Sequence, residues 1–159
     1  MALEETGILE QEEDTQHGRY LTFAVGEEVY GIGIEMVTEI VGLQPITTMP
    51  EMPDYIMGII NLRGKIIPVM DMRRRFHKEP MSYNERTCII VLDIHDVSVG
   101  LIVDHVNEVA SINDEDIAPP PDYLGGMENK YISGIGKTGG EVKLLLDAEK
   151  LLHDEAALH

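Results

Sequence analysis

The chain is short of cysteine, of basic residues and of long apolar runs, and each shortage excludes a class of protein. Cys88 is the single cysteine among 159 residues, which excludes an internal disulfide framework and favours a reducing compartment. Twelve Lys and Arg stand against 29 Asp and Glu, and a net charge of −17 disfavours nucleic acid as a partner. No segment approaches the roughly 18 to 20 apolar residues of a membrane span, and the N-terminus lacks the layout of a secretory signal. We therefore expect a cytoplasmic protein that does not insert into a membrane.

The first 17 residues form an acidic segment without a hydrophobic period. They include Glu4, Glu10 and Asp14 and contain no Lys or Arg. Segments of low hydrophobicity and high charge bury too little apolar surface to fold. We predict a disordered tail over residues 1–17, followed by enough sequence for one domain or two small subdomains that share a core.

Strand-like segments separated by turn residues every 8 to 12 positions predict about nine or ten short strands. The clearest are a hairpin of 20–25 with 29–34 around Gly26-Glu27-Glu28, three strands over 88–94, 97–104 and 106–112, and a hairpin of 131–137 with 141–146. A rigid connector is expected at 118–122, where three prolines follow one another. So many short strands with few helices indicate an all-β fold of small barrels.

Three short helical segments are predicted as well. Ile34, Val37, Ile40 and Val41 recur at spacings of three and four, which favours one or two helical turns over 35–41. Asp54 is a plausible N-cap for a turn through Ile56, Met57 and Ile60, and Gly58 there would let another backbone come close. Asp147 is expected to cap a short C-terminal helix over 148–153.

The stretch from Asn61 to Phe76 concentrates positive charge. Half of the twelve Lys and Arg residues lie between Arg63 and Lys78. Gly64-Lys65 predicts a hairpin turn, and Pro68, which has no N–H, predicts an edge strand or a site where the missing donor faces outward. Arg73-Arg74-Arg75 could bind anions, although ion pairing within an acidic chain and a solvated face explain them better.

No constellation of residues indicates catalysis. Asp93, His95 and Asp96, or Asp104-His105, lack the further ligand that would complete a metal site. Asp71 and Asp93 are not brought together by any pattern, and no serine or cysteine lies in a nucleophile-elbow motif. We therefore expect neither an enzyme nor a metal or cofactor, and we interpret Cys88 as a small buried hydrophobe within a strand.

Several motifs follow one another along the chain. They are Val29-Tyr30-Gly31-Ile32-Gly33-Ile34 with Val37-Thr38-Glu39-Ile40, Gly58-Ile59-Ile60-Asn61-Leu62-Arg63-Gly64, Ile67-Pro68-Val69-Met70-Asp71-Met72-Arg73, 99–106, 117–121, 131–136 and 144–152. In this order they closely resemble the CheW family of bacterial chemotaxis coupling proteins. The resemblance covers the chain from about Tyr20 to Leu152.

The resemblance implies a fold and a role. The expected fold is a pair of intertwined five-stranded SH3-like β-barrels within a single domain over 18–159, divided near 76–86. The expected role is a non-catalytic adaptor that links the cytoplasmic tips of chemoreceptors (methyl-accepting chemotaxis proteins) to the CheW-like regulatory domain of the histidine kinase CheA. Such an adaptor would be cytoplasmic and recruited to receptor arrays at the inner face of the membrane.

Matching positions imply a receptor-binding groove between the barrels formed by Ile34, Val37, Glu39, Gly58 and Arg63. They also imply motif positions at Asn61, Gly64, Pro68 and Asp71. Arg63 would either hold Glu39 and orient the groove or contact the receptor directly. Two alternatives stay open: a small-barrel module that binds anions or ligands through 73–75, and a coupler in a CheW-like array that controls an output other than chemotaxis.

Overall fold

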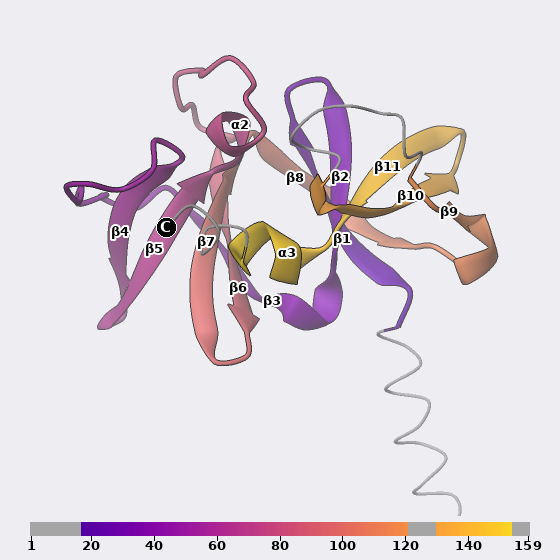
Figure 1. The fold of residues 1–159 in the computed structure, drawn as a ribbon, viewed down its shortest axis with the longest axis horizontal. Helices are drawn as coiled ribbons and strands as arrows, with labels where there is room; N and C mark the ends of the chain where they lie inside the picture. Colours follow the sequence, from indigo (N-terminus) through magenta and orange to yellow (C-terminus); the bar gives the residue numbers. More distant parts are fainter. Residues whose placement is uncertain (1–16, 121–129, 154–159) are drawn as a thin grey trace, which may run out of the picture.

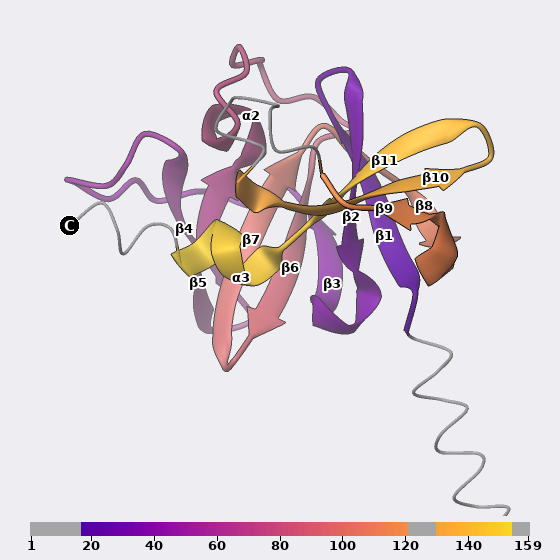
Figure 2. The ribbon, with the colours of Figure 1, turned by 45° about the vertical axis from the view of Figure 1, so that its right-hand side comes forward.

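The computed structural model describes residues 17–120 and 130–153. The predicted tail therefore lies outside the described residues except for His17, and so does the end of the proline connector. The fold is all-β, with two sheets packed side by side and a few short helices (Figures 1 and 2). Within the described parts of the chain, no helix has the length and apolar character needed to cross a membrane.

The first sheet combines the two ends of the chain. Its strand order is β8-β1-β2-β11-β10-β9. The strands are β1 (Arg19–Val25), β2 (Glu28–Gly33), β8 (His105–Ser111), β9 (Ile117–Ala118), β10 (Ile132–Thr138) and β11 (Glu141–Leu146). The predicted hairpins β1–β2 and β10–β11 are confirmed, and β9 adds a two-residue sixth strand that the sequence did not predict.

The second sheet is built from the middle of the chain, in the order β3-β6-β7-β5-β4. Its strands are β3 (Val37–Gly42), β4 (Ile56–Leu62), β5 (Lys65–Asp71), β6 (Cys88–Ile94) and β7 (Val97–Val103). The chain leaves the first sheet after β2 and returns to it at Asp104, between β7 and β8. The two SH3-like barrels are therefore intertwined rather than successive, and the predicted division near 76–86 falls within the stretch that forms the second sheet.

The helical turn predicted over 35–41 is mostly wrong. Only a 3₁₀ turn, η1 (Ile34–Met36), forms, and β3 begins at Val37. A bulge between Val37 and Glu39 interrupts the alternation, so Val37 opposes Leu92 while Ile40 opposes Ile90. Residues that oppose each other on paired strands point to the same face, and Leu92 and Ile90 belong to the same core cluster. The bulge therefore places Val37 and Ile40 on one face at a spacing of three, which resembles the spacing of a helix.

The helical turn predicted after Asp54 is also wrong, because residues from Ile56 onward form β4. A second bulge, between Ile56 and Gly58, gives the same false signal. The predicted C-terminal helix is confirmed as α3 (Ala148–His153), and the Lys150 N–H donates to Asp147 Oδ1 at 3.1 Å.

Pro68 does not lie in an edge strand, because β5 runs between β7 and β4. Two features make the proline acceptable there. Pairing with β7 begins only at Val69. On the other side Pro68 faces Ile59, whose N–H and C=O are both hydrogen-bonded to Thr47 at 2.9 Å. The absence of an N–H at Pro68 therefore removes no hydrogen bond between the strands.

Most of the hydrophobic core lies between the barrels. This inter-barrel core joins residues of β1 and β2 to residues of β5, β6 and β7, and it includes Leu151 of α3. The chain has six tyrosines and two phenylalanines, and five of these eight rings lie here. They are Phe23, Tyr30, Tyr55, Phe76 and Tyr131. A smaller cluster of Ile60, Ile67, Val69, Ile89, Val91 and Ile102 fills the second barrel.

Candidate protein-interaction site

Glu39 and Arg63 form an ion pair on the surface of the second barrel. Glu39 lies on β3, and Arg63 lies in the turn between β4 and β5. Arg63 (φ 54) and Gly64 (φ 86) both have left-handed backbones, and the Gly64 N–H donates to Asn61 Oδ1 at 2.8 Å. The turn thereby aims the Arg63 side chain at β3, and the hydrogen bond from Arg63 holds the pKa of the Glu39 carboxyl below its usual value.

This ion pair joins the two ends of the second sheet, since β3 and β4 are the outermost strands in its order. We call the junction between these two ends of the sheet the seam. A second contact closes it: Thr47 and Ile59 exchange two backbone hydrogen bonds of 2.9 Å. A cavity of about 300 Å³ lies beside the ion pair, with Ile67 and Val91 among its lining residues. The barrel is thus closed by one polar pair and one isolated bridge rather than by a continuous ladder.

Gly58 has a structural reason to be glycine. It is buried, its φ is 145°, and a Cβ there would lie 2.1 Å from the carbonyl oxygen of Thr47. The predicted close approach of another backbone is therefore made within the chain, by the residues that close the seam. A contact of Gly58 with a receptor stays a prediction.

Ile34 and Val37 are half-buried and pack against the inter-barrel core. Ile40, on the same face as Val37, is 44% exposed, and Leu43 is exposed just beyond the end of β3. Of the five predicted groove residues, the structure brings Glu39 and Arg63 into direct contact at the seam. Ile34 in η1 and Val37 on β3 pack against the inter-barrel core, and Gly58 lies against the backbone of Thr47. A shared receptor-binding groove stays a prediction.

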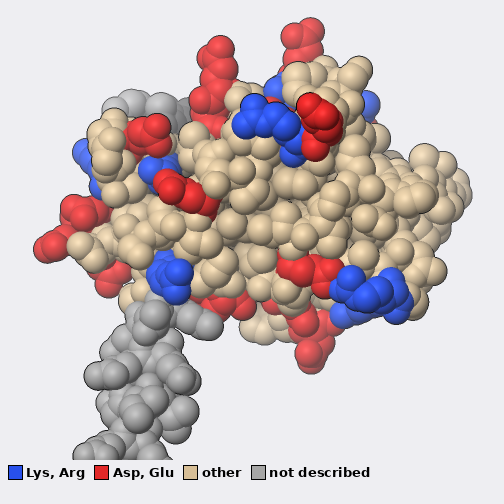
Figure 3. All heavy atoms as spheres, turned by 180° about the vertical axis from the view of Figure 1, so that it is seen from behind, with Lys and Arg blue, Asp and Glu red and all other residues tan. Residues whose placement is uncertain are grey.

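The sequence did not identify Ile40 and Leu43 as part of an exposed apolar surface, because the bulge at Val37 hid which face each side chain takes. Met49 and Met52, on the β3–β4 connection, are exposed too, in keeping with the adaptable methionine surface that suits a protein partner. Seen from behind, a broad uncharged surface crosses the middle of the molecule and most charged side chains lie toward its rim (Figure 3). In a chain of net charge −17, such a surface suits a protein partner better than an ionic ligand.

The basic run at 73–75 largely makes contacts within the protein. It forms a short helix, α2 (Met72–Arg75), and the Asp71 carboxylate caps it by accepting the N–H groups of Arg73 at 2.9 Å and Arg74 at 3.3 Å. Tyr83 donates its hydroxyl to the other Asp71 oxygen at 2.7 Å. Asp71 therefore caps α2 and holds the Tyr83 side chain.

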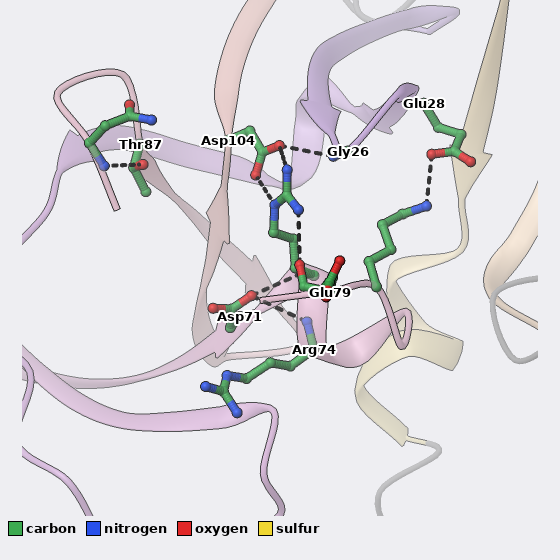
Figure 4. Close-up of polar contacts among 10 residues, drawn as sticks. Gly26, Glu28, Asp71, Arg74, Glu79, Thr87 and Asp104 are labelled. Carbon is green, nitrogen blue, oxygen red and sulfur yellow. Dashed lines mark hydrogen bonds and ion pairs between the residues drawn. The ribbon is translucent and has the colours of Figure 1, made fainter. Parts of the chain in front are cut away.

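Arg73 forms a bidentate ion pair with Asp104, the residue between β7 and β8 at which the chain passes from one sheet to the other. Both N–H···O distances are 2.8 Å, and the Gly26 N–H adds a third bond to Asp104 at 2.9 Å (Figure 4). Burial alone would raise the pKa of the Asp104 carboxyl, but these bonds outweigh it and lower the pKa. The expected ion pairing is confirmed for Arg73, whereas Arg75 is buried rather than solvated.

The other residues considered for metal binding or nucleophilic chemistry do not form a site within the described parts of the chain. Among the described residues, no three His, Cys, Asp or Glu side chains lie close enough to hold a metal ion. Cys88 is half-buried and packs against the inter-barrel core. Burial raises the pKa of its thiol, with the backbone N–H of Val106 acting in the opposite direction.

Comparison with known proteins identifies the family. A model of the CheW-like domain matches residues 19–156. The chain is 39% identical to chemotaxis protein CheW of Klebsiella aerogenes over 142 residues, 89% of this chain and 86% of that protein. It is 35% identical to chemotaxis protein CheW of Treponema pallidum over 135 residues, 82% of this chain and 79% of that protein. The crystal structure of the scaffolding protein TtCheW from Thermoanaerobacter tengcongensis superposes with a TM-score of 0.79 at 38% identity, covering 84% of this chain and 91% of that one. The chain therefore belongs to the CheW-like family.

Proposed function

We propose that this chain is a non-catalytic adaptor that couples chemoreceptors to the histidine kinase CheA in chemotaxis signalling. The observation that carries the proposal is the CheW-like match over residues 19–156, which includes every described strand of both barrels. The relatives are described as chemotaxis and scaffolding proteins. The exposed apolar side chains on and beside β3 also suit a surface that works by contact.

The receptor tip would dock along β3. An amphipathic helix from a receptor would place its apolar face against Ile34, Val37 and Ile40, in the helix-in-groove mode. Arg63, held by Glu39 at the edge of this surface, would set the position of polar groups on the helix. The kinase would bind through its CheW-like regulatory domain, and the complex would sit in receptor arrays at the inner face of the membrane.

A reconstitution with purified components tests this proposal. Immobilised cytoplasmic receptor fragment and CheA regulatory domain should each retain the wild-type chain, and the three should form a ternary complex. Arg63→Glu should weaken receptor binding by at least about tenfold, roughly 1.4 kcal/mol, while leaving kinase binding unchanged. If the wild type binds neither component, the proposed function is wrong.

A charge exchange separates the two roles of Arg63. If Arg63 acts by orienting the groove through Glu39, the double variant Glu39→Arg/Arg63→Glu should restore most of the receptor affinity, because the pair is re-formed in reverse. If Arg63 contacts the receptor directly, the exchange should bind no better than Arg63→Glu. Circular dichroism of all variants controls for folding.

A further inference from the structure

Arg75 is a buried cation at the junction of the two barrels. It is 4% exposed although it lies on α2, within a run of three arginines. Its guanidinium carbon lies 4.1 Å from the centroid of the Tyr55 ring and 4.7 Å from the centroid of the Tyr131 ring. Its Nη2 donates to the carbonyl oxygen of Leu151 at 3.1 Å. One side chain therefore contacts three segments that are distant in sequence.

The two rings belong to different barrels. Tyr55 directly precedes β4, and its carbonyl accepts the N–H of Asp71 at 2.7 Å, which ties it to the second barrel. Tyr131 directly precedes β10 of the first barrel, and its carbonyl accepts the N–H of Asp147 at 2.7 Å, which ties it to the start of α3. In both ribbon views α3 lies against β6 and β7 of the second barrel (Figures 1 and 2). The Arg75 side chain thus holds elements of both barrels and the helix that crosses between them.

Polar contacts near α2 also join the barrels, through the Arg73–Asp104–Gly26 bonds and the Lys78–Glu28 ion pair at 2.7 Å, and much of the remaining contact is apolar. It includes a row of aromatic rings, with Tyr30 and Phe76 stacked at 4.9 Å between centroids and Phe76 tilted against Tyr131 at 6.2 Å. Hydrophobic burial is non-directional and defines a relative orientation only weakly. A planar guanidinium that contacts two rings and donates a hydrogen bond has a narrow geometric tolerance.

We propose that Arg75 is a positioning residue that fixes the orientation of the two barrels relative to each other, and thereby the shape of the surface along β3 between them. The effect of barrel orientation on receptor binding rests on the proposed function. The effect of Arg75 on barrel orientation does not, so the two are tested by different measurements.

Spin-label distances measure the orientation directly. In a Cys88→Ala background, labels at Val142→Cys on β11 and Ile66→Cys on β5 report the inter-barrel distance. Labels at Ile66→Cys and Val97→Cys, both in the second barrel, report an internal distance. All three positions are more than half exposed. Arg75→Met removes the cation and keeps a similar length, and Arg75→Lys restores a cation between the rings.

The expected result is a broadened or shifted inter-barrel distribution in Arg75→Met, an unchanged internal distribution, and partial rescue by Arg75→Lys. Receptor-fragment binding should weaken at least fivefold in Arg75→Met, while binding of the kinase domain changes less than twofold. If Arg75→Met does not fold, Tyr55→Leu with Tyr55→Phe as its matched control replaces it, and only the leucine variant should broaden the distribution. A folded Arg75→Met, or failing that Tyr55→Leu, with the inter-barrel distribution of the background overturns the proposal. If the Cys88→Ala background chain binds no receptor fragment, the proposed function is wrong. The inter-barrel distances would still test whether Arg75 fixes the orientation of the barrels.

Discussion

Replacing Gly58 by alanine tests how the second barrel closes. A Cβ at this position would lie 2.1 Å from the carbonyl oxygen of Thr47 and 2.8 Å from its carbonyl carbon. Both are backbone atoms, so no change of rotamer relieves the overlap. Thr47 must move away, and its two hydrogen bonds with Ile59, each 2.9 Å long, are then lost or strained.

The expected loss follows from these contacts. Two backbone hydrogen bonds contribute about 1 kcal/mol each, and holding alanine at a φ of 145° costs about 1–3 kcal/mol. The free energy of unfolding should therefore fall by about 3–5 kcal/mol, a large share of the roughly 5–15 kcal/mol typical of a domain. Urea denaturation followed by circular dichroism measures the loss.

Gly42→Ala is the matched control. Gly42 lies on β3 of the same barrel, a Cβ there would meet no atom within 4 Å, and its φ is not in the positive range. Alanine should change the stability at this position by less than about 1 kcal/mol, and in the stabilising direction if at all. If Gly58→Ala also stays within about 1 kcal/mol of the wild type, the bridge between Thr47 and Ile59 does not hold the seam closed.

Two further predictions concern titrating groups. Because the pKa of Asp104 is lowered in the folded state, the pair with Arg73 contributes stability above the ordinary aspartate pKa of about 4 and loses it as the pH falls through the lower value. Asp104→Asn should reduce the free energy of unfolding by about 2 kcal/mol at neutral pH and by much less near about pH 2, and equal losses in urea denaturation at both pH values would contradict this. Because burial raises the pKa of the Cys88 thiol, a maleimide should modify it at least about tenfold more slowly in the native protein than in urea. Equal rates in the two states would show that the thiol is accessible.

Local pattern predicted most strands, because short apolar segments bounded by turn residues marked them. The predictions for 88–94, 97–104 and 131–146 are confirmed within a residue or so. Strands β6 and β7 are buried along most of their length, whereas β10 and β11 also carry exposed residues. The two failures, at 35–41 and after Asp54, both fall on bulges, where one extra residue shifts the alternation toward a helical spacing.

For the candidate site, the resemblance identified the partners Glu39 and Arg63, and the structure shows that they form an ion pair. The receptor-binding role of that pair and of its neighbours stays a prediction. The function of Gly58 could not be read from its position in a motif, because the atom that excludes a side chain there belongs to Thr47, on a separate segment.

The sequence by itself determined the absence of an internal disulfide framework, the all-β class, the capped C-terminal helix and the family, since each depends on composition, on local order or on motifs in sequence. Only the tertiary structure decided how the barrels close and join. The seam depends on Thr47 meeting Ile59 and on Glu39 meeting Arg63, and the junction depends on Arg75 reaching Leu151, 76 residues away. Such contacts leave no period in the sequence, because the partners become neighbours only after the strands between them have paired.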